Sequence, residues 1–211
     1  MQNLTALQVM QDAPVIPVIV LDDIASALPV ARALVAGGIR MLEITLRTPQ
    51  ASDIIAAIAR ELPQAVVGAG TVRNREDVQT ALRAGARFLV SPGYSSALGN
   101  AAREARLPLL PGVATGSEIL AALDDGFDAL KFFPALQAGG TSILKAWSGP
   151  FADVKFCPTG GITPDNARDF LALPNVACVG GSWLVPADCV ARQDWAAITQ
   201  LAKQACQLRN P

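Results

Sequence analysis

Short apolar runs alternate with segments of helical periodicity along the whole of this 211-residue chain, and eight such pairs can be counted. Strands that alternate with helices pair in parallel through right-handed crossovers. Eight units predict an α/β protein with a closed (β/α)8 fold, the TIM barrel. The expected strands are residues 15–20, 41–47, 65–70, 88–91, 107–111, 129–132, 155–157 and 176–179. The expected helices are residues 22–36, 49–61, 74–84, 95–105, 116–125, 142–147, 164–171 and 194–208.

The N-terminal segment and the uniform composition complete the predicted organisation of the chain. Residues 4–11 are amphipathic and predict a short N-terminal helix that lies across the body of the barrel. No linker, low-complexity tract or shift in composition divides the sequence. We therefore expect residues 1–211 to form a single domain, although it is short for a barrel and must have short loops.

Composition excludes several classes of function. With 17 basic and 18 acidic residues the net charge is −1, which gives no electrostatic reason to expect nucleic acid or a membrane surface as a partner. The apolar runs have the length of strands and are interrupted by charges, so none is expected to span a bilayer. The N-terminus lacks the pattern of a secretion signal, and we expect a cytoplasmic protein.

The cysteine and histidine content limits which catalytic and metal-binding groups the chain can use. The cysteines at 157, 178, 189 and 206 contain no C-x-x-C pair, so buried free thiols are expected rather than disulfides or a thiolate metal site. The chain has no histidine, which removes the commonest general base and the commonest zinc ligand. We predict no metal, and acid–base chemistry must use a carboxylate, lysine, tyrosine or water.

One lysine stands inside an apolar strand. The run of residues 129–134 reads ALKFFP and places Lys131 among apolar neighbours before a proline that ends regular structure. An ammonium group in such a run must reach water, find a partner or lose its proton. The alternative to a functional role is a lysine on an edge strand whose head group simply reaches solvent.

The second expected strand carries polar residues on one face. Because side chains alternate along a strand, Glu43, Thr45 and Arg47 share a face opposite to Leu42 and Ile44. In a parallel barrel the outer face packs on helices and must be apolar, so the polar set is expected to point into the barrel toward its mouth. An ordinary amphipathic strand, or a structural Glu–Arg ion pair, would show the same pattern.

Glycines follow the last two expected strands. Gly160-Gly161 comes after the seventh, and Gly180-Gly181-Ser182 comes after the eighth. Barrels often bind phosphate at this place through backbone N–H groups, which only a glycine backbone can bring close to the oxygens. The alternative interpretation is that both glycine stretches form ordinary turns without a ligand. The Gly68-Ala-Gly70 stretch lacks the G-x-G-x-x-G spacing and does not indicate a dinucleotide site.

Taken together, these strand ends suggest a mechanism. A desolvated lysine can lose its proton and attack a ketone to form a Schiff base. A carboxylate such as Glu43 can move protons for dehydration and for cleavage of a carbon–carbon bond. Arg47 is suited to hold a substrate carboxylate, Thr71 can add a hydrogen bond, and a phosphate at the last two strands would hold the other end of the substrate.

The motifs resemble those of the 2-dehydro-3-deoxy-phosphogluconate (KDPG) and 4-hydroxy-2-oxoglutarate (KHG) aldolase family over nearly the whole chain. The matching stretches are PVIV at 17–20, LEITLRT at 42–48, VGAGTV at 67–72, SPG at 91–93, LPGV at 110–113, KFFP at 131–134, FCPTGGI at 156–162 and GGSWLVP at 180–186.

The resemblance implies a class I aldolase of the Entner–Doudoroff pathway that forms pyruvate and glyceraldehyde 3-phosphate. It assigns Lys131 as the Schiff-base lysine and Glu43 as the proton-transfer residue. The other implied contacts are Arg47 and Thr71 for the pyruvate carboxylate, Pro92 and Phe133 for the pocket, and Thr159, Gly160, Gly161, Gly181 and Ser182 for the distal hydroxyl and phosphate.

The resemblance further implies a homotrimer that uses no metal or cofactor, its only covalent group being the Schiff base on Lys131. It also implies activity on 4-hydroxy-2-oxoglutarate, which yields pyruvate and glyoxylate. Two other functions are compatible with the same residues: a non-catalytic barrel that binds a phosphorylated metabolite, and a phosphate-binding isomerase or epimerase. The preference for gluconate- or galactonate-derived substrates is left open.

Overall fold

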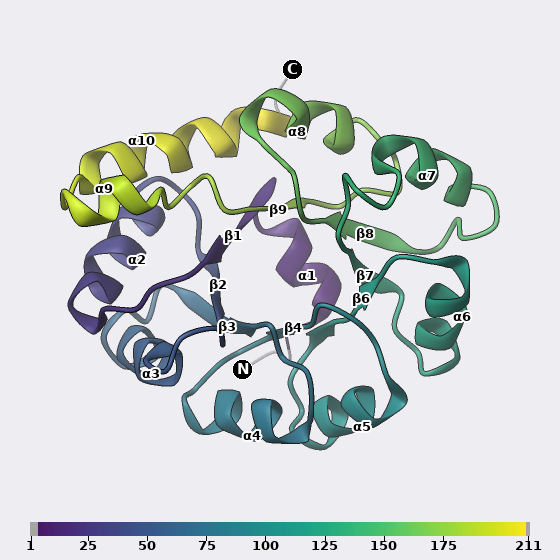
Figure 1. Ribbon diagram of the computed structural model, residues 1–211, viewed down its shortest axis with the longest axis horizontal. Coiled ribbons are helices and arrows are strands. Elements are labelled where there is room, and N and C mark those ends of the chain that lie inside the picture. Colours follow the sequence, from purple (N-terminus) through teal and green to yellow (C-terminus); the bar gives the residue numbers. More distant parts are fainter. Residues whose placement is uncertain (1–3, 210–211) are drawn as a thin grey trace.

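The computed structural model describes residues 4–209. Helices form an outer ring around the strands, and α1 (Ala6–Gln11) crosses the centre of that ring (Figure 1). Every strand pairing is parallel, so the fold is α/β with parallel strands in curled sheets. No helix of the described residues is long and apolar enough to cross a membrane.

The larger sheet has six strands in the order β5-β4-β3-β2-β1-β9. Their bounds are β1 Val15–Ile19, β2 Met41–Thr45, β3 Val66–Gly70, β4 Leu89–Val90, β5 Leu109–Leu110 and β9 Val179–Gly181. Consecutive strands lie beside one another from β1 to β5, as right-handed strand–helix–strand units require. The last strand, β9, returns to pair with the first, β1.

The smaller sheet has the order β6-β7-β8, formed by β6 Gly112–Val113, β7 Ala129–Phe132 and β8 Lys155–Pro158. Two isolated parallel bridges, Phe156 to Val176 and Thr159 to Gly180, connect its far edge to the chain of β9. On the other side only Pro111 separates β5 from β6. The two sheets are therefore neighbours along both edges.

The helices cover the outside of the strands. Their bounds are α2 Ala27–Ala36, α3 Ala51–Glu61, α4 Arg75–Arg83, α5 Ser96–Glu104, α6 Gly116–Asp124, α7 Gly140–Trp147, α8 Pro164–Leu171, α9 Ala187–Ala191 and α10 Trp195–Cys206, with 3₁₀ turns at Ile24–Ser26 and Gln207–Arg209. The predicted stops are confirmed after α2, α4 and α6, where Gly38, Gly85 and Gly126 adopt the positive φ that glycine tolerates best.

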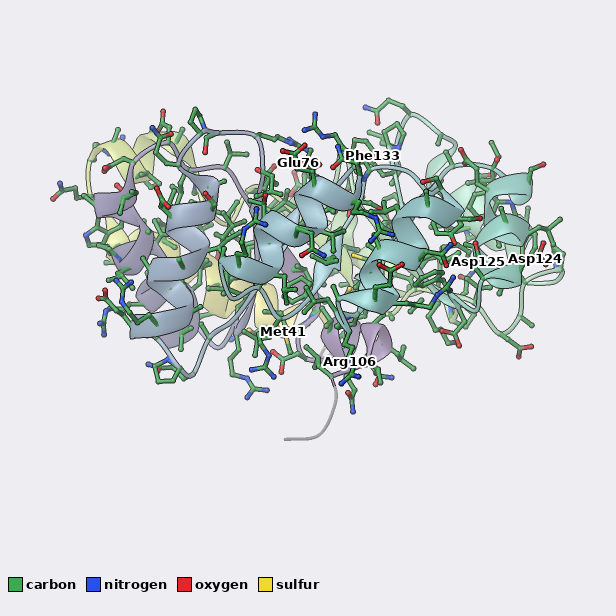
Figure 2. The ribbon with its side chains drawn as sticks, turned by 90° about the horizontal axis from the view of Figure 1, so that it is seen from below. Met41, Glu76, Arg106, Asp124, Asp125 and Phe133 are labelled. Carbon is green, nitrogen blue, oxygen red and sulfur yellow. The ribbon has the colours of Figure 1, made fainter. Side chains whose placement is uncertain are left out.

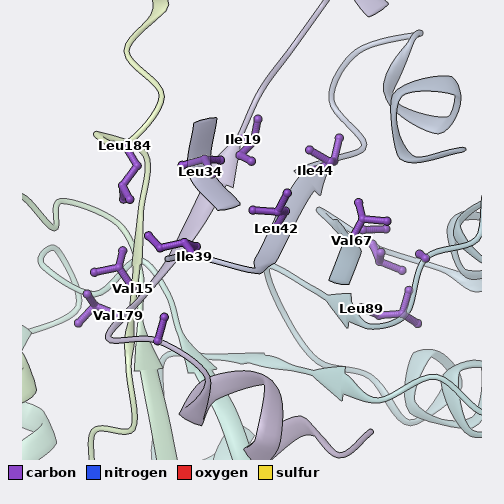
Figure 3. Packing of buried hydrophobic residues seen from close by; sticks show 14 of the residues in the cluster. Val15, Ile19, Leu34, Ile39, Leu42, Ile44, Val67, Leu89, Val179 and Leu184 are labelled. Carbon is purple, nitrogen blue, oxygen red and sulfur yellow. The ribbon is translucent and has the colours of Figure 1, made fainter. Parts of the chain in front are cut away.

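Two apolar clusters divide the core. The larger one lies between strands and helices and joins alternate strand residues such as Val15, Ile19, Leu42 and Ile44 to Leu34 of α2 (Figure 3). The smaller one lies on the inner side of the curled sheets and contains the opposite set, Ile16, Met41, Phe88, Val90, Leu110, Ala129, Cys157 and Cys178, together with Val9 and Met10 of α1. α1 thus closes the end of the interior at which the strands begin.

The structure differs from the expected elements at two places that bear on the site. The strand expected at residues 107–111 is two short strands, because Pro111 has no N–H to donate and the chain changes neighbours there, from β4 to β7. The strand expected at 41–47 ends at Thr45, where Arg47 N turns back to donate to the Thr45 carbonyl at 2.8 Å. The short helix α9 was not expected.

Candidate active site

Lys131 lies on β7, on the inner side of the curled sheets. Its neighbours Leu130 and Phe132 belong to the outer cluster and Ala129 to the inner one, so alternation directs the Lys131 side chain inward. The residue is only 4% exposed, which excludes the solvent-reaching lysine that sequence left open. Its register partners on the two sides are Gly112 of β6 and Cys157 of β8.

Glu43 meets this lysine from the opposite sheet. It lies on β2, is 3% exposed, and places Oε1 3.5 Å from Lys131 Nζ. This separation allows an ion pair, but within residues 4–209 Oε1 receives no hydrogen bond. A buried carboxylate oxygen without a hydrogen bond is costly and is a feature of sites that await a ligand or a proton. The predicted Lys–Glu pair is present, and the structural Glu–Arg pair is not among the ion pairs of the described residues.

Glycines of β3 make room for this carboxylate, a function that sequence reasoning missed. A Cβ on Gly70 would lie 2.7 Å from Glu43 Cγ, and one on Gly68 would lie 2.5 Å from the Phe88 ring. Both glycines face the interior, one at the level of Glu43 and one at the level of the apolar cluster. The sequence signal was the Gly-Ala-Gly run, which has its explanation here rather than in a nucleotide loop.

Phe133 forms a wall beside the lysine. Lys131 Nζ lies 5.4 Å from the centre of the Phe133 ring, and a Cβ on Gly160 would lie 3.3 Å from the same ring. Phe133 lies at the opposite edge of the molecule from Met41 and Arg106 (Figure 2). The ring is therefore at the end where the strands finish, between Lys131 and the loop after β8.

Arg47 and Thr71 are brought together, although Arg47 is not on the strand. Arg47 Nε donates to Thr71 Oγ1 at 2.9 Å. Thr71 has φ of 59°, a left-handed conformation that is uncommon for a residue with a branched side chain and typical of functional sites. Within the described residues the other guanidinium nitrogens of Arg47 make no hydrogen bond, so its planar fork remains available for a carboxylate.

Thr45, the third member of the predicted polar face, has a structural contact. Its buried hydroxyl donates to the Ile19 carbonyl of β1 at 3.1 Å. The hydrogen bond ties the ends of β1 and β2 together just beyond Glu43. Thr45 therefore supports the strand ends instead of facing the lysine.

The predicted distal residues gather at one edge. The parallel bridge between Thr159 and Gly180 sets the two following segments, Gly160-Gly161 and Gly181-Ser182, side by side. Gly160 and Gly161 have φ of 101° and 75°, and a Cβ on Gly180 would lie 2.9 Å from Thr159 Cγ2. Successive residues with positive φ are a backbone arrangement in which N–H groups can converge on an anion.

Ser182 and Pro92 lie on different sides of the mouth. Ser182 is exposed and lines a cavity of about 550 Å³ that also includes Val18 of β1 and Ala187, Val190 and Ala191 of α9. Pro92 packs its backbone against β6, since a Cβ on Gly112 would lie 2.6 Å from the Pro92 carbonyl oxygen. The predicted site residues therefore lie around the strand ends and not on one side of them.

The buried thiol of Cys178 lies in surroundings that favour its neutral form. Burial raises the pKa of Cys178 well above the ordinary range, and Cys157 raises it further. A neutral thiol is a poor nucleophile, so Cys178 does not compete with Lys131. Within residues 4–209 no group of three or more His, Cys, Asp or Glu side chains is placed to hold a metal ion.

Comparison with known proteins gives one consistent family. Residues 7–201 match the family model described as KDPG and KHG aldolase. The KHG/KDPG aldolase of Escherichia coli K12 is 51% identical over 203 residues, which are 96% of this chain and 95% of the relative.

Two solved structures extend the match. A KDPG aldolase from Legionella pneumophila, with pyruvate captured as a covalent carbinolamine intermediate, has a TM-score of 0.94 and 46% identity over 96% of this chain and 98% of its own. A Zymomonas mobilis ZM4 aldolase with 3-phosphoglycerate has a TM-score of 0.92 and 50% identity, covering 96% of this chain and 95% of its own.

Proposed function

The chain belongs to the KDPG and KHG aldolase family and is a carbon–carbon lyase, and we propose that it cleaves 2-dehydro-3-deoxy-6-phosphogluconate to pyruvate and glyceraldehyde 3-phosphate. The observation that carries this proposal is the buried pair in which Lys131 Nζ lies 3.5 Å from a Glu43 oxygen without a hydrogen bond. An amine and a carboxylate that lie together at the strand ends support the roles of nucleophile and proton carrier that we propose for them.

Lys131 is the nucleophile of this reaction. Its amine adds to the keto carbon, and the carbinolamine loses water to give a protonated imine. Cleavage of the bond between C3 and C4 then leaves its electron pair in an enamine conjugated with the nitrogen, while the C4 hydroxyl loses its proton and becomes the aldehyde. Protonation of the enamine and hydrolysis release pyruvate and restore the amine. No cofactor takes part in this proposal.

Glu43 carries the protons of these steps, directly or through water. Its side chain is close enough to Nζ to serve the carbinolamine, and its buried position keeps other proton donors away. General acid–base catalysis of this kind contributes about 10²- to 10⁴-fold in rate. The gap left by Gly70 fixes where the carboxylate lies.

The remaining residues hold the substrate. Arg47 and Thr71 bind the carboxylate of the pyruvate portion, with Pro92 and Phe133 as the walls of that pocket. The distal hydroxyl and the phosphate bind to the segments that the Thr159–Gly180 bridge places together. These segments supply Thr159, Gly160, Gly161, Gly181 and Ser182. The crystal structure of the Zymomonas mobilis relative with 3-phosphoglycerate supports a phosphorylated ligand here.

The same site would accept 4-hydroxy-2-oxoglutarate, which is cleaved to pyruvate and glyoxylate. This second substrate shares the pyruvate half and needs no phosphate contact. The E. coli relative, at 51% identity, is named for both activities. We propose that both reactions use Lys131 and Glu43.

Four further features belong to the proposal. The sheets close into one (β/α)8 barrel, supported by the bridges from β8 to the chain of β9 and by the single residue between β5 and β6. Residues 1–211 form one domain. The protein works in the cytoplasm, for which its free cysteines are typical. It assembles as a homotrimer, as the family resemblance implies.

The products released from candidate keto-deoxy acids test this proposal. We expect 2-dehydro-3-deoxy-6-phosphogluconate to yield pyruvate and glyceraldehyde 3-phosphate in equal amounts, with both identified by mass spectrometry. Lys131→Met removes the amine and keeps an apolar stem of similar length, and should lower cleavage at least about 10³-fold. Lys145→Met, on α7, is the matched control and should keep full activity.

A non-catalytic barrel would release neither product, and an isomerase or epimerase would return a compound of unchanged mass. Either result with the folded wild-type protein would overturn the proposed function. Full cleavage by Lys131→Met would reject Lys131 as the nucleophile.

A further inference from the structure

The structure has a break at Pro111, where the sheet that carries Glu43 gives way to the sheet that carries Lys131. β4 pairs with β5 before the break, and β6 pairs with β7 after it. We propose that Ser91 is a positioning residue that bridges this break and sets the location of Lys131 relative to Glu43. The inference rests on the proposed function, because it assumes that these two residues act together.

Ser91 is placed to make this connection by its hydroxyl group. It follows β4 directly and is 0% exposed. Its Oγ donates to the Gly93 carbonyl at 2.7 Å and accepts the backbone N–H of Gly112 at 3.2 Å. One side chain therefore joins the loop after β4 to the first residue of β6.

Gly112 connects the hydrogen bond of Ser91 to the strand that carries Lys131. It is the register partner of Lys131 on β7, and the Lys131 N–H donates to the Pro111 carbonyl at 2.8 Å. A shift of Gly112 would therefore move the backbone from which the Lys131 side chain extends. Glu43 would not follow, because β2 belongs to the six-stranded sheet together with β4.

The packing at the break supports a close fit. A Cβ at Gly112 would lie 2.6 Å from the Pro92 carbonyl oxygen and 2.7 Å from Gly93 N, so the two backbones touch only because residue 112 is glycine. Pro92 is itself a proposed wall of the pyruvate pocket. Ser91 thus fixes both that wall and the lysine strand.

Loss of the hydroxyl would leave the buried Gly112 N–H without its partner and would also free the carbonyl of Gly93, an exposed residue. The Gly112 N–H and the Gly93 carbonyl must then shift or admit water to regain a hydrogen bond. A displacement of about 1 Å at a reacting group can lower the rate about 10²-fold even when each residue is still present. The expected defect is therefore in the cooperation of Lys131 with Glu43, rather than in the lysine itself.

Two reactions of pyruvate separate these effects. Borohydride trapping after equilibration with pyruvate measures the amount of imine on the Lys131 amine, whereas the rate at which the pyruvate methyl hydrogens exchange in D₂O also depends on proton transfer by Glu43. We expect Ser91→Ala to slow exchange about tenfold and to change trapping by less than about twofold. Ser91→Cys keeps the size but weakens both hydrogen bonds, and should slow exchange by a smaller factor.

Thr199→Val is the matched control. Thr199 of α10 also uses a partly buried hydroxyl, which donates to the Ala33 carbonyl at 3.1 Å, but it lies outside the break. It should lower the melting temperature without changing either reaction of pyruvate. Should Ser91→Ala fail to fold, Ser91→Cys decides the question.

Unchanged exchange in a folded Ser91 variant would overturn the inference, and so would an equal loss of trapping and exchange. Absence of both reactions in the wild-type protein would instead overturn the proposed function. The two failures are therefore distinguishable.

Discussion

The two ends of the inner side of the curled sheets are built by the same strands but have opposite character. β2 contributes Met41 to the apolar cluster and, two residues later, Glu43 to the site. β7 does the same with Ala129 and Lys131. The beginning of each strand is covered by α1, whereas its end carries buried polar groups.

This difference shows that the start of a strand can serve stability while the end of the same strand carries the candidate site. Two residues along a strand advance about 6.6 Å and return the side chain to the same face. One such step is enough to pass from a closed apolar core to a buried ion pair. The apolar end can therefore hold the strands in place while the other end keeps an oxygen of Glu43 without a hydrogen bond.

The largest expected effect comes from the apolar end. Met41→Ala should lower the free energy of unfolding by about 2–5 kcal/mol, because Met41 is buried against α1 and the inner cluster. Urea denaturation measures this loss. At a temperature where the variant is folded, its cleavage rate should stay within about twofold of the wild type. A selective loss of cleavage with unchanged stability would show that the two ends are not separate.

The converse change lies two residues further along the same strand. Glu43→Gln keeps the shape and removes the proton carrier, and should lower cleavage about 10²-fold. Imine formation with pyruvate should persist, as measured by borohydride trapping. Near-normal turnover would remove Glu43 from proton transfer.

A smaller effect is expected at the rim. Ser182 is exposed and offers one hydroxyl, so Ser182→Ala should raise the KM for the phosphorylated substrate about three- to tenfold. The KM for 4-hydroxy-2-oxoglutarate, which lacks the phosphate, should not change. Steady-state kinetics on both substrates provide the comparison, and equal changes in both KM values would contradict a phosphate contact.

The contrast between the apolar and the polar ends of the strands was partly predictable from the sequence. Alternation along a strand predicted that Glu43 points inside the parallel strands, because its sequence neighbours are apolar and must face helices. For Lys131 the apolar run predicted an amine that must reach water, find a partner or lose its proton. The distal glycines could be assigned to one edge because they follow the last strands of the chain. Periodicity and strand order, both local properties, were sufficient for these residues.

Other features depend on contacts between distant segments and could not be predicted. The strand expected at 107–111 was wrong at its end, because the residues after Pro111 pair with β7, where the Phe133 N–H donates to the Val113 carbonyl at 3.1 Å. Arg47 was expected on the strand, but it lies beyond the end of β2 and donates a hydrogen bond to Thr71. The space that Gly70 leaves for Glu43 requires knowledge of which strands are neighbours.

The central claim is that Lys131 forms a Schiff base with pyruvate, and borohydride trapping tests it most directly. The chain has further lysines at 145, 155 and 203, which serve as internal controls in the same digest. We predict a single carboxyethyl group, located on Lys131 by peptide mapping and absent from Lys131→Met. No adduct under turnover conditions, or an adduct on another lysine, would contradict the account.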